Sequence, residues 1–424
     1  MSSSNSKPIR LGVCGLGGYA RVVLKMLQAA ADKFEPRFEL VAACDLDLAA
    51  HGDLTPVLKD RGVSLYENYA EMLKHPALDV VWLPLPIQLH APYTKQAVAA
   101  GIAVICEKPT AGCIDDLYDM IKVRDESGQP VFISYHTIPH SACVKAKTLL
   151  MEGVIGKVQH ASLVASWPRH LQYYNRNNWA GRLKVDQTWV LDSPMNNALS
   201  HFVNLVLYLL GSSFDAWADP CWLDVELYRA NKIENFDTVC AQLKNCNKTT
   251  AQVILTHAAK KQFGPELKIV GDQGVMWWEQ DRIRIARHGE AVEVVYEHGD
   301  DDIAMRLSLV KSAARFIYGM PADGVSYTTL ESTIPHMKVV CGASEATPVY
   351  DVPAEFTYTY DDPSNGPAVA IKGFEEVISA CSDGGLMLHE SGLLQFAKPH
   401  GSIDLTDYVS FAGPAEYQAI STNG

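Results

Sequence analysis

Short apolar runs alternate with amphipathic stretches through the first third of the chain. The runs are typical of buried strands, and the stretches between them repeat apolar residues at helical spacing. Strands are predicted at 9–14, 38–44, 62–66, 79–86, 102–106 and 131–135, with a first helix over about 19–34. This rhythm predicts a doubly wound parallel sheet, in which a ligand binds beyond the carboxyl ends of the strands.

The pattern changes after about residue 140. A helix near 143–152, a strand near 158–166 and a helix near 199–210 precede a series of strands between about 217 and 296, which predicts an antiparallel sheet. Helices are predicted at about 303–318, 331–344 and 373–383. We expect an α/β chain with a doubly wound domain at 1–138 and, at 139–424, an α+β domain with a large, mainly antiparallel sheet. The segment after about residue 350 belongs to this second domain unless it packs back on the first.

The first predicted strand leads into a glycine-rich turn, Gly15-Leu16-Gly17-Gly18-Tyr19-Ala20, and then into the first helix. Gly15 permits a tight turn, Gly17 lets the backbone approach a phosphate, and Ala20 allows close packing of helix on strand. The free N–H groups at the helix N-terminus attract an anion. A glycine pattern alone is a weak signal, but this strand–turn–helix context predicts a Rossmann-type dinucleotide site.

Asp45 stands at the end of the second predicted strand. An acidic residue at that place accepts hydrogen bonds from the adenosine ribose hydroxyls. Asp45 and Asp47 would repel a ribose 2′-phosphate, which favours NAD over NADP. The alternative interpretation of Asp45 is a turn residue at a strand end.

Composition narrows the class of protein. The chain has 424 residues, 48% of them hydrophobic, and a net charge of -13, so it offers no electrostatic attraction to nucleic acid or to an anionic membrane. No apolar run approaches the ~20 residues of a membrane span, and the polar N-terminus does not resemble a signal peptide. The ten cysteines are scattered without a metal-binding motif, which predicts a reduced, cytoplasmic protein without a metal site.

Lys108 follows the fifth predicted strand, within Glu107-Lys108-Pro109. An ammonium group at the ligand edge of the sheet can hydrogen-bond a hydroxyl or carbonyl oxygen, and partial burial would bring its pKa toward the range of acid–base catalysis. The alternative is an ordinary surface lysine.

A second candidate site lies at Asn197 and His201, with Asn204 three residues further on. On a helix these side chains would share one face. Histidine is suited to removing a hydroxyl proton while hydride leaves the same carbon. A buried structural histidine remains the alternative.

The loop between these regions is rich in amide, guanidinium and aromatic groups, which are typical of a site for a polyhydroxylated ligand. Its candidate ligand-binding residues are Arg169, Tyr174, Arg176, Asn178 and Trp179. A polar loop with structural aromatic residues is the alternative.

The glycine turn, Asp45, Glu107-Lys108-Pro109 and the His201 helix occur in an order that resembles the glucose–fructose oxidoreductase / inositol dehydrogenase (Gfo/Idh/MocA) family. Residues 79–90 are similar to the family's fourth strand, D-A-V-I-V-A-T-P-N-x-x-H. Residues 197–204 are similar to its helix motif, D-x-G-x-H-x-x-D. The resemblance covers about residues 8–350.

The resemblance implies NAD(P)-dependent oxidation or reduction of a sugar, inositol, related polyol or sugar acid, and a homodimer or homotetramer that associates through the second domain's sheet. It implies that Lys108, His201 and the residue at 197 are catalytic, and that Lys108 and His201 also bind substrate. The cofactor-binding set that it implies is Gly15, Leu16, Gly17, Gly18, Tyr19, Asp45, Leu85, Pro86, His90, Glu107 and Lys108.

One departure from the family concerns Asn197, where the family carries aspartate. An amide cannot act as a proton acceptor, so Asp186 and Asp192 are candidate substitutes for the missing carboxylate. Two other functions stay open. One is a glycosidase or lyase of the same family that retains NAD and uses transient oxidation. The other is a non-catalytic regulator that binds dinucleotide or sugar.

Overall fold

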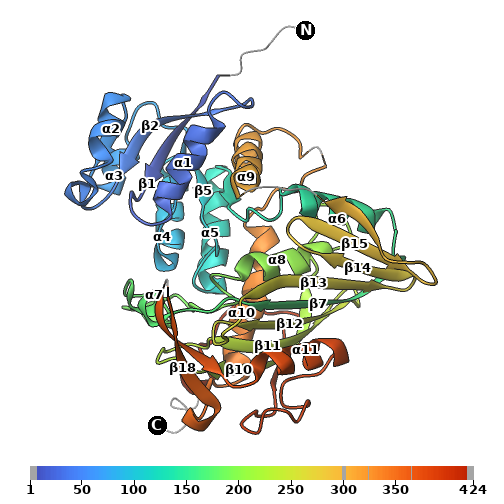
Figure 1. Ribbon diagram of the computed structural model, residues 1–424. Coiled ribbons are helices and arrows are strands. Elements are labelled where there is room, and N and C mark those ends of the chain that lie inside the picture. The colour runs from blue at the N-terminus through green and yellow to red at the C-terminus, as the bar shows by residue number, and fades with distance from the viewer. Residues whose placement is uncertain (1–6, 298–301, 323, 364, 418–424) are drawn as a thin grey trace. The chain divides into compact units, whose positions relative to one another are not determined.

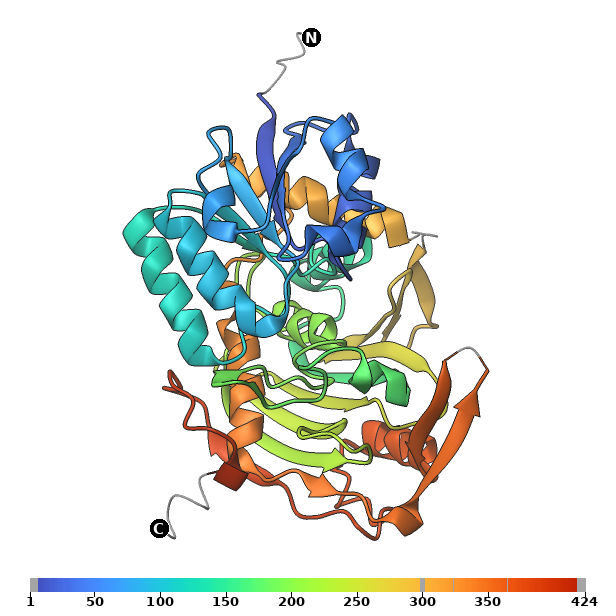
Figure 2. The ribbon, with the colours of Figure 1, turned by 90° about the vertical axis from the view of Figure 1, so that its left-hand side faces the viewer.

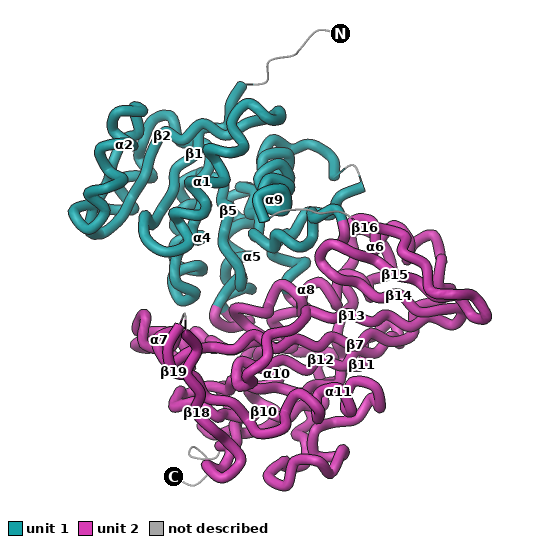
Figure 3. Tube along the Cα trace, in the orientation of Figure 1, with its two compact units in different colours: residues 1–111, 116–141, 300–333 teal, residues 112–115, 142–299, 334–424 magenta. Residues whose placement is uncertain are grey.

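The computed structural model describes residues 7–297, 302–322, 324–363 and 365–417. The chain divides into two compact units, coloured separately in Figure 3. Unit 1 comprises residues 1–111, 116–141 and 300–333, and unit 2 comprises residues 112–115, 142–299 and 334–424.

Unit 1 is built on a six-stranded parallel sheet with the order β3-β2-β1-β4-β5-β6 (Figure 1). Its strands are β1 (Ile9–Cys14), β2 (Phe38–Cys44), β3 (Ser64–Tyr66), β4 (Val80–Leu83), β5 (Ala103–Cys106) and β6 (Val131–Ile133). The strand order reverses between β1 and β4, and in such sheets ligands bind at the carboxyl ends of the two strands that flank the reversal. The predicted doubly wound sheet is thus confirmed.

Helices cover both faces of this sheet, as the burial of all four residues of β4 and β5 requires. They are α1 (Ala20–Ala30), α2 (Thr55–Asp60), α3 (Tyr69–Met72), α4 (Ile87–Ala99) and α5 (Ile114–Ser127), with a 3₁₀ turn η1 (Leu48–His51). The first helix ends at Ala30, four residues earlier than the predicted end at 34, because the chain turns through Asp32, whose φ is 62°.

A late helix returns to unit 1. Helix α9 (Asp302–Ile317) lies beside α1 in Figures 1 and 2 and contributes Leu309, Val310 and Ala313 to the same core as Val13. The predicted boundary at 138 omitted this return. Residues after 350, for which packing on the first domain was left open, belong to unit 2.

Unit 2 is dominated by a ten-stranded, mainly antiparallel sheet with the path β16-β15-β14-β13-β7-β12-β11-β10-β17, and β20 also pairs with β10. Its strands are β7 (Val158–Ser166), β10 (Pro220–Arg229), β11 (Thr238–Asn245), β12 (Thr250–Thr256), β13 (Phe263–Gly271), β14 (Gly274–Trp278), β15 (Arg282–Arg287), β16 (Glu293–Glu297), β17 (Tyr350–Asp351) and β20 (Gly401–Asp404). The β7–β12 and β10–β17 pairs are parallel.

Helices lie on both faces of this sheet. Leu223 of β10 is near Gly342 of α10 (Ile334–Ala346), whereas Tyr228 of β10 and Cys240 of β11 pack with Phe374 of α11 (Phe374–Gly384). The other elements are α6 (Ser141–Met151), α7 (Leu171–Asn175), α8 (Ser200–Leu209), η2 (Glu331–Thr333, in unit 1), η3 (Ala354–Phe356) and the pairs β8–β9 (Lys184–Val185, Thr188–Trp189) and β18–β19 (Thr357–Asp362, Gly366–Ile371). The β18–β19 hairpin is the orange-red pair of strands in Figure 2. Among the described residues, no helix has the length and apolarity that crossing a bilayer requires.

Candidate active site

The glycine turn connects β1 to α1 beside the point where the strand order of unit 1 reverses. Gly15 has a φ of 99°, which favours glycine, and its amide donates to the carbonyl oxygen of Cys44 at 2.7 Å. A Cβ on Gly18 would meet no atom within 4 Å, so a ligand can approach the backbone there. Within the described residues, the amides of Gly17 and Gly18 donate no hydrogen bond and are available to an anion. The turn therefore fits a pyrophosphate.

Asp45 follows β2 and lies against this turn. Its Oδ2 accepts a hydrogen bond from the Leu16 amide at 2.8 Å and lies 3.1 Å from Nε2 of His51, while its Oδ1 accepts from the Asp47 amide at 3.1 Å. These bonds fix the carboxylate beside the glycine turn. A carboxylate oxygen can accept more than one hydrogen bond, so Asp45 keeps the capacity to bind a ribose hydroxyl.

The turn after β4 lies next to the glycine turn. A Cβ on Gly15 would lie 3.4 Å from both Leu85 Cδ2 and the Pro84 carbonyl oxygen. Pro86 is the N-cap residue of α4. The ring of buried His90 spans two carbonyl groups, with Nδ1 at 2.7 Å from the oxygen of Pro109 and Nε2 at 2.9 Å from that of Leu85. Burial lowers the pKa of His90 to about 4. His90 therefore joins the β4 turn to the segment after β5, a positioning role that the sequence did not distinguish from cofactor contact.

Glu107 and Lys108 follow β5 at the same edge of the sheet. Glu107 is buried and accepts a hydrogen bond from Nε1 of Trp82 at 3.0 Å. Burial raises the pKa of Glu107 to about 7, an effect that the Trp82 hydrogen bond and the charge of Lys108 partly offset. Lys108 is half-buried, and its charge also lowers the pKa of His90. A cation therefore stands at the ligand edge of the sheet, as predicted.

Sequence reasoning missed two groups of unit 1 at this edge. Arg306 of α9 donates from Nη1 to the hydroxyl of Tyr19 in the glycine turn at 2.8 Å. His136, in the loop after β6, has a pKa lowered to about 3 by burial and by the charges of Arg306 and Lys108. Arg306 lies far along the chain from the turn, so only the packing of α9 could reveal it.

In unit 2, α8 carries His201 in its first turn, and the His201 side chain is largely buried. Asn204 lies three residues further along the same helix. Asn197 does not lie on α8, which corrects the prediction of one shared helical face. The chain from 194 to 199 forms turns, in which the amide of Ser200 donates to the carbonyl oxygen of Asn197 at 3.4 Å.

Asn197 belongs to a network with a buried carboxylate. Its Nδ2 donates to Asp192 Oδ1 at 2.7 Å and to the Tyr173 hydroxyl at 3.3 Å. Asp192 Oδ2 also accepts from the Gly181 amide at 2.6 Å. Of the two substitutes suggested for the family's aspartate, Asp192 therefore lies beside Asn197, whereas Asp186 is exposed at the turn between β8 and β9.

Two arginines stack on Tyr173. The Cζ atom of Arg176 lies 3.5 Å from the centroid of its ring, and that of Arg169 lies 4.7 Å away. Arg176 also lies over Trp179, at 5.3 Å from the ring centroid. Cation–π stacking holds both guanidinium groups near the Asn197 network.

The other residues of this loop have different surroundings. Arg182 forms an ion pair with Glu234, and Asn178 is exposed. Tyr174 is half-buried, and its hydroxyl oxygen, which solvent does not reach, has no partner among the described residues. Sequence reasoning missed His257. Burial lowers the pKa of His257 to about 3, and its ring centroid lies 6.3 Å from that of Tyr173. Its strand-end position carries no motif that could have singled it out.

Each unit thus assembles its own set of groups. The strand order of unit 1, the glycine turn at its switch point and the acid after β2 define a dinucleotide-binding protein. Comparison with protein families agrees. Residues 9–135 match the oxidoreductase family with an NAD-binding Rossmann fold, and residues 143–277 match the GFO/IDH/MocA C-terminal domain. The chain belongs to the Gfo/Idh/MocA family of oxidoreductases and carries an NAD-binding Rossmann domain.

Curated relatives match over part of their length. A dTDP-3,4-didehydro-2,6-dideoxy-alpha-D-glucose 3-reductase of Streptomyces violaceoruber is 29% identical over 163 residues, which are 38% of this chain and 46% of that protein. A D-xylose 1-dehydrogenase [NADP(+)] of Haloarcula marismortui is 26% identical over 155 residues, 37% of this chain and 42% of that protein. The chain thus spans less than half the length of each of these relatives.

Solved structures share the fold over most of the chain. The WlbA dehydrogenase of Bordetella pertussis, solved with NADH and UDP-GlcNAcA, has a TM-score of 0.65 and 22% identity, covering 80% of this chain and 97% of that one. A levoglucosan dehydrogenase solved with NADH and L-sorbose has a TM-score of 0.65 and 16% identity, covering 80% and 96%. At these identities the likeness establishes the fold.

Proposed function

We propose that this chain transfers hydride between NAD and a sugar, inositol, related polyol or sugar acid. The observation that carries the proposal is the network of Asn197, Asp192 and Tyr173, next in the chain to the His201 helix. The network supplies amide, carboxylate and hydroxyl groups to a hydroxylated substrate, in a chain whose other unit binds NAD. The names of relatives that act on sugars support the same substrate class.

The residues take separate roles in this proposal. In the oxidative direction, His201 accepts the proton of the substrate hydroxyl, and Lys108 stabilises the negative charge that develops on that oxygen. Bound NAD supplies the acceptor for the hydride. Asn197 orients the substrate, and its hydrogen bond to Asp192 fixes the orientation of its amide. Arg169 and Arg176 bind substrate oxygens, with Tyr174 and Trp179 beside them.

The cofactor set comprises the glycine turn, Asp45, the Leu85–Pro86 turn and Glu107–Lys108. NAD is preferred over NADP because the carboxylates of Asp45 and Asp47 would repel a 2′-phosphate. His51 Nε2 lies 3.1 Å from Asp45 Oδ2 and helps to hold this carboxylate beside the glycine turn.

The test is a panel of sugars, inositols and sugar acids, assayed by NADH absorbance with NAD and NADP in parallel. The expected result is turnover on at least one member, with kcat/KM higher for NAD. Absence of turnover on every member in both directions would contradict the proposal.

One relative favours a second candidate. A glycosyl hydrolase family 109 protein of Stenotrophomonas maltophilia is 24% identical over 166 residues, 37% of this chain and 36% of that protein. An enzyme that retains NAD and uses transient oxidation would cleave a glycoside without net consumption of cofactor. Release of nitrophenol from nitrophenyl glycosides, without added NAD and without NADH accumulation, would support this candidate over the dehydrogenase.

A further inference from the structure

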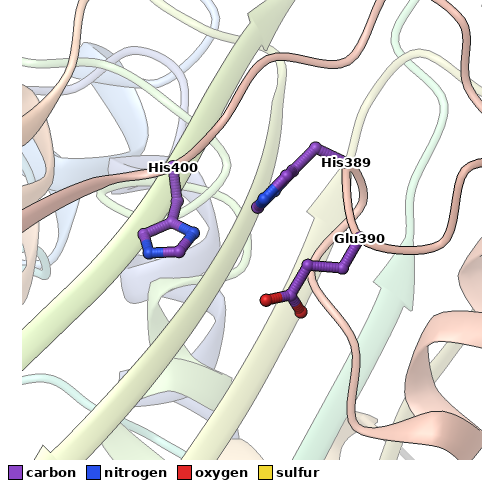
Figure 4. Close-up of side chains that lie close together, drawn as sticks. All are labelled: His389, Glu390 and His400. Carbon is purple, nitrogen blue, oxygen red and sulfur yellow. The ribbon is translucent and has the colours of Figure 1, made fainter.

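Two histidines and a glutamate meet in the segment of unit 2 between α11 and β20. Potential ligand atoms of His389, Glu390 and His400 all lie within 4.8 Å of one another. Figure 4 shows the two imidazole rings and the carboxylate converging on a common space. The cluster lies apart in the sequence from the residues assigned above to cofactor and substrate.

His389 is oriented by a buried carboxylate. Its Nδ1 lies 2.6 Å from Glu226 Oε1, and the side chain of Glu226 has 0% exposure. Glu226 also accepts from the Tyr228 hydroxyl at 2.6 Å, so its position on β10 is fixed. An Nδ1–H donated to Glu226 leaves the Nε2 lone pair of His389 available. This carboxylate–histidine pair is the arrangement that typically supports a metal-binding imidazole.

His400 supplies a second ring nitrogen. Its Nδ1 is inaccessible to solvent and has no hydrogen-bond partner among the described residues, while its Nε2 lies 3.8 Å from Asp224. A buried polar atom without a partner is costly, and a metal ion would satisfy it. Glu390 Oε2 accepts from the Met387 amide at 2.9 Å, which anchors the carboxylate.

We propose that His389, Glu390 and His400 bind a divalent transition-metal ion, for which Zn²⁺ is the best match. Two imidazoles and one carboxylate suit Zn²⁺, whereas Mg²⁺ and Ca²⁺ prefer all-oxygen sites. Zinc–ligand bonds of ~2.0–2.2 Å place tetrahedral ligands about 3.4 Å apart. The side chains therefore close in by roughly 1 Å through rotamer adjustment, and water takes the fourth position.

The ion has a structural role. His389 is tied to β10 through Glu226, and His400 directly precedes β20, the strand that pairs with β10. Binding of the ion fastens the two ends of the segment 389–400 to each other and to the sheet. The sequence predicted no metal site because it contains no cysteine motif and no matching pair of histidines. His389 and Glu390 are adjacent, but His400 follows ten residues later, a spacing that matches neither signature.

The experiment uses the full chain, freed of any affinity tag, stripped with EDTA and then freed of chelator. Calorimetric titration with ZnCl₂ at pH 7.5 is expected to give one Zn²⁺ per chain and a higher Tm in the zinc-bound protein. His389→Gln, His400→Gln and Glu390→Gln are each expected to weaken binding at least about tenfold, and Glu226→Gln roughly 10- to 100-fold. His288→Gln, which changes an exposed histidine elsewhere, is the matched control and is expected to bind as the wild type does.

Glu390 is exposed, so Glu390→Gln is expected to fold and still tests the site if a histidine variant fails to fold. Equal stoichiometric binding by the wild type, Glu390→Gln and His400→Gln would overturn the proposal, as would no stoichiometric binding by the wild type. The titration does not depend on turnover, so the result stands or falls separately from the proposed dehydrogenase activity.

Discussion

Glu107 and Lys108 are neighbours in the chain but lie in different surroundings. The carboxyl group of Glu107 is buried beside Trp82, which raises its pKa to about 7, whereas Lys108 is half-buried at the ligand edge of the sheet. In the proposed function Lys108 meets a substrate oxygen, whereas the charge state of Glu107 is governed by its burial. The two residues call for different experiments.

Replacement of Lys108 tests catalysis. In Lys108→Ala the developing charge on the substrate oxygen loses its cation, so kcat is expected to fall by about 100-fold or more. NADH binding, followed by fluorescence, is expected to change little. Lys95→Ala is the control, because Lys95 pairs with Asp119 on the outside of unit 1. A Lys108→Ala enzyme with the wild-type kcat would remove Lys108 from the mechanism.

Replacement of Glu107 tests the pH dependence of stability. The pKa of Glu107 is raised from 4.5 to about 7 in the folded chain, so the folded state favours the protonated form. Its contribution to stability is fully present below pH 4.5 and is lost as the pH rises through about 7. The shift corresponds to about 3 kcal/mol.

We expect Glu107→Gln, which stays neutral, to gain stability relative to the wild type as the pH rises from 5 to 8. Urea unfolding across that range measures the difference between the two proteins. The two proteins are compared with each other because buried His90, with a pKa of about 4, gives both of them the opposite pH dependence of stability. Its contribution cancels in the comparison. Glu126→Gln, at an exposed position, should show no such trend, and parallel curves for Glu107→Gln and the wild type would contradict the assignment.

At the scale of elements, strand ends were predictable and the contacts of loops were not. Apolar runs located β1, β2, β4 and β5, and the residues that follow a parallel strand must lie at one edge of the sheet. Gly15, Asp45 and Lys108 could therefore be placed from the sequence. Spacing alone placed Asn197 on one helical face with His201. In the structure α8 begins at Ser200, and residues 194–199 form turns.

Groups brought in by tertiary packing escaped prediction for a physical reason. Arg306 reaches the glycine turn only because α9 packs on α1, and His257 meets Tyr173 only through the folding of unit 2. Neither residue lies in a local pattern that differs from an ordinary helix or strand end. Asp192 was named as one of two candidates, and its contact with Asn197 distinguishes it from Asp186.

Helix α11 offers an element-scale test. Phe374 is fully buried and packs in the core that α11 forms with β7, β10, β11 and β12. Phe374→Ala is expected to lower the free energy of unfolding of unit 2 by about 3–5 kcal/mol. Hydrogen exchange of the β10–β12 amides measures that loss, and NADH binding by unit 1 should persist. Val409→Ala, at an exposed side chain, should stay within about 0.5 kcal/mol of the wild type. Equal protection in the two variants would contradict the role of α11.

At the scale of the whole chain, the large sheet of unit 2 is covered unevenly. On the face that carries Val164 and Cys240, α11 and the following segment bury β7, β12, β11 and β10 with Phe374, Leu388 and Phe396. The same face continues across β13 and β14. There Val270 pairs with Val275, and Lys268 pairs with Trp277, and all four side chains are only partly buried. Among the described residues, the part of this face that α11 and the following segment leave uncovered lies over β13–β16, and there we place the expected association of chains.

We predict a homodimer that uses this uncovered part of the sheet. Trp277→Arg would add a third cation between its cross-strand neighbours Arg284 and Lys268, without a partner of opposite charge. It is expected to convert the dimer to a monomer in multi-angle light scattering at micromolar concentration. Trp222→Arg is the matched control, because Trp222 lies on β10, which pairs with β20 far from β13–β16 in the strand order, and it should leave the dimer intact. A monomeric wild type, or dissociation by Trp222→Arg alone, would show that the sheet's exposed part is not the contact between chains.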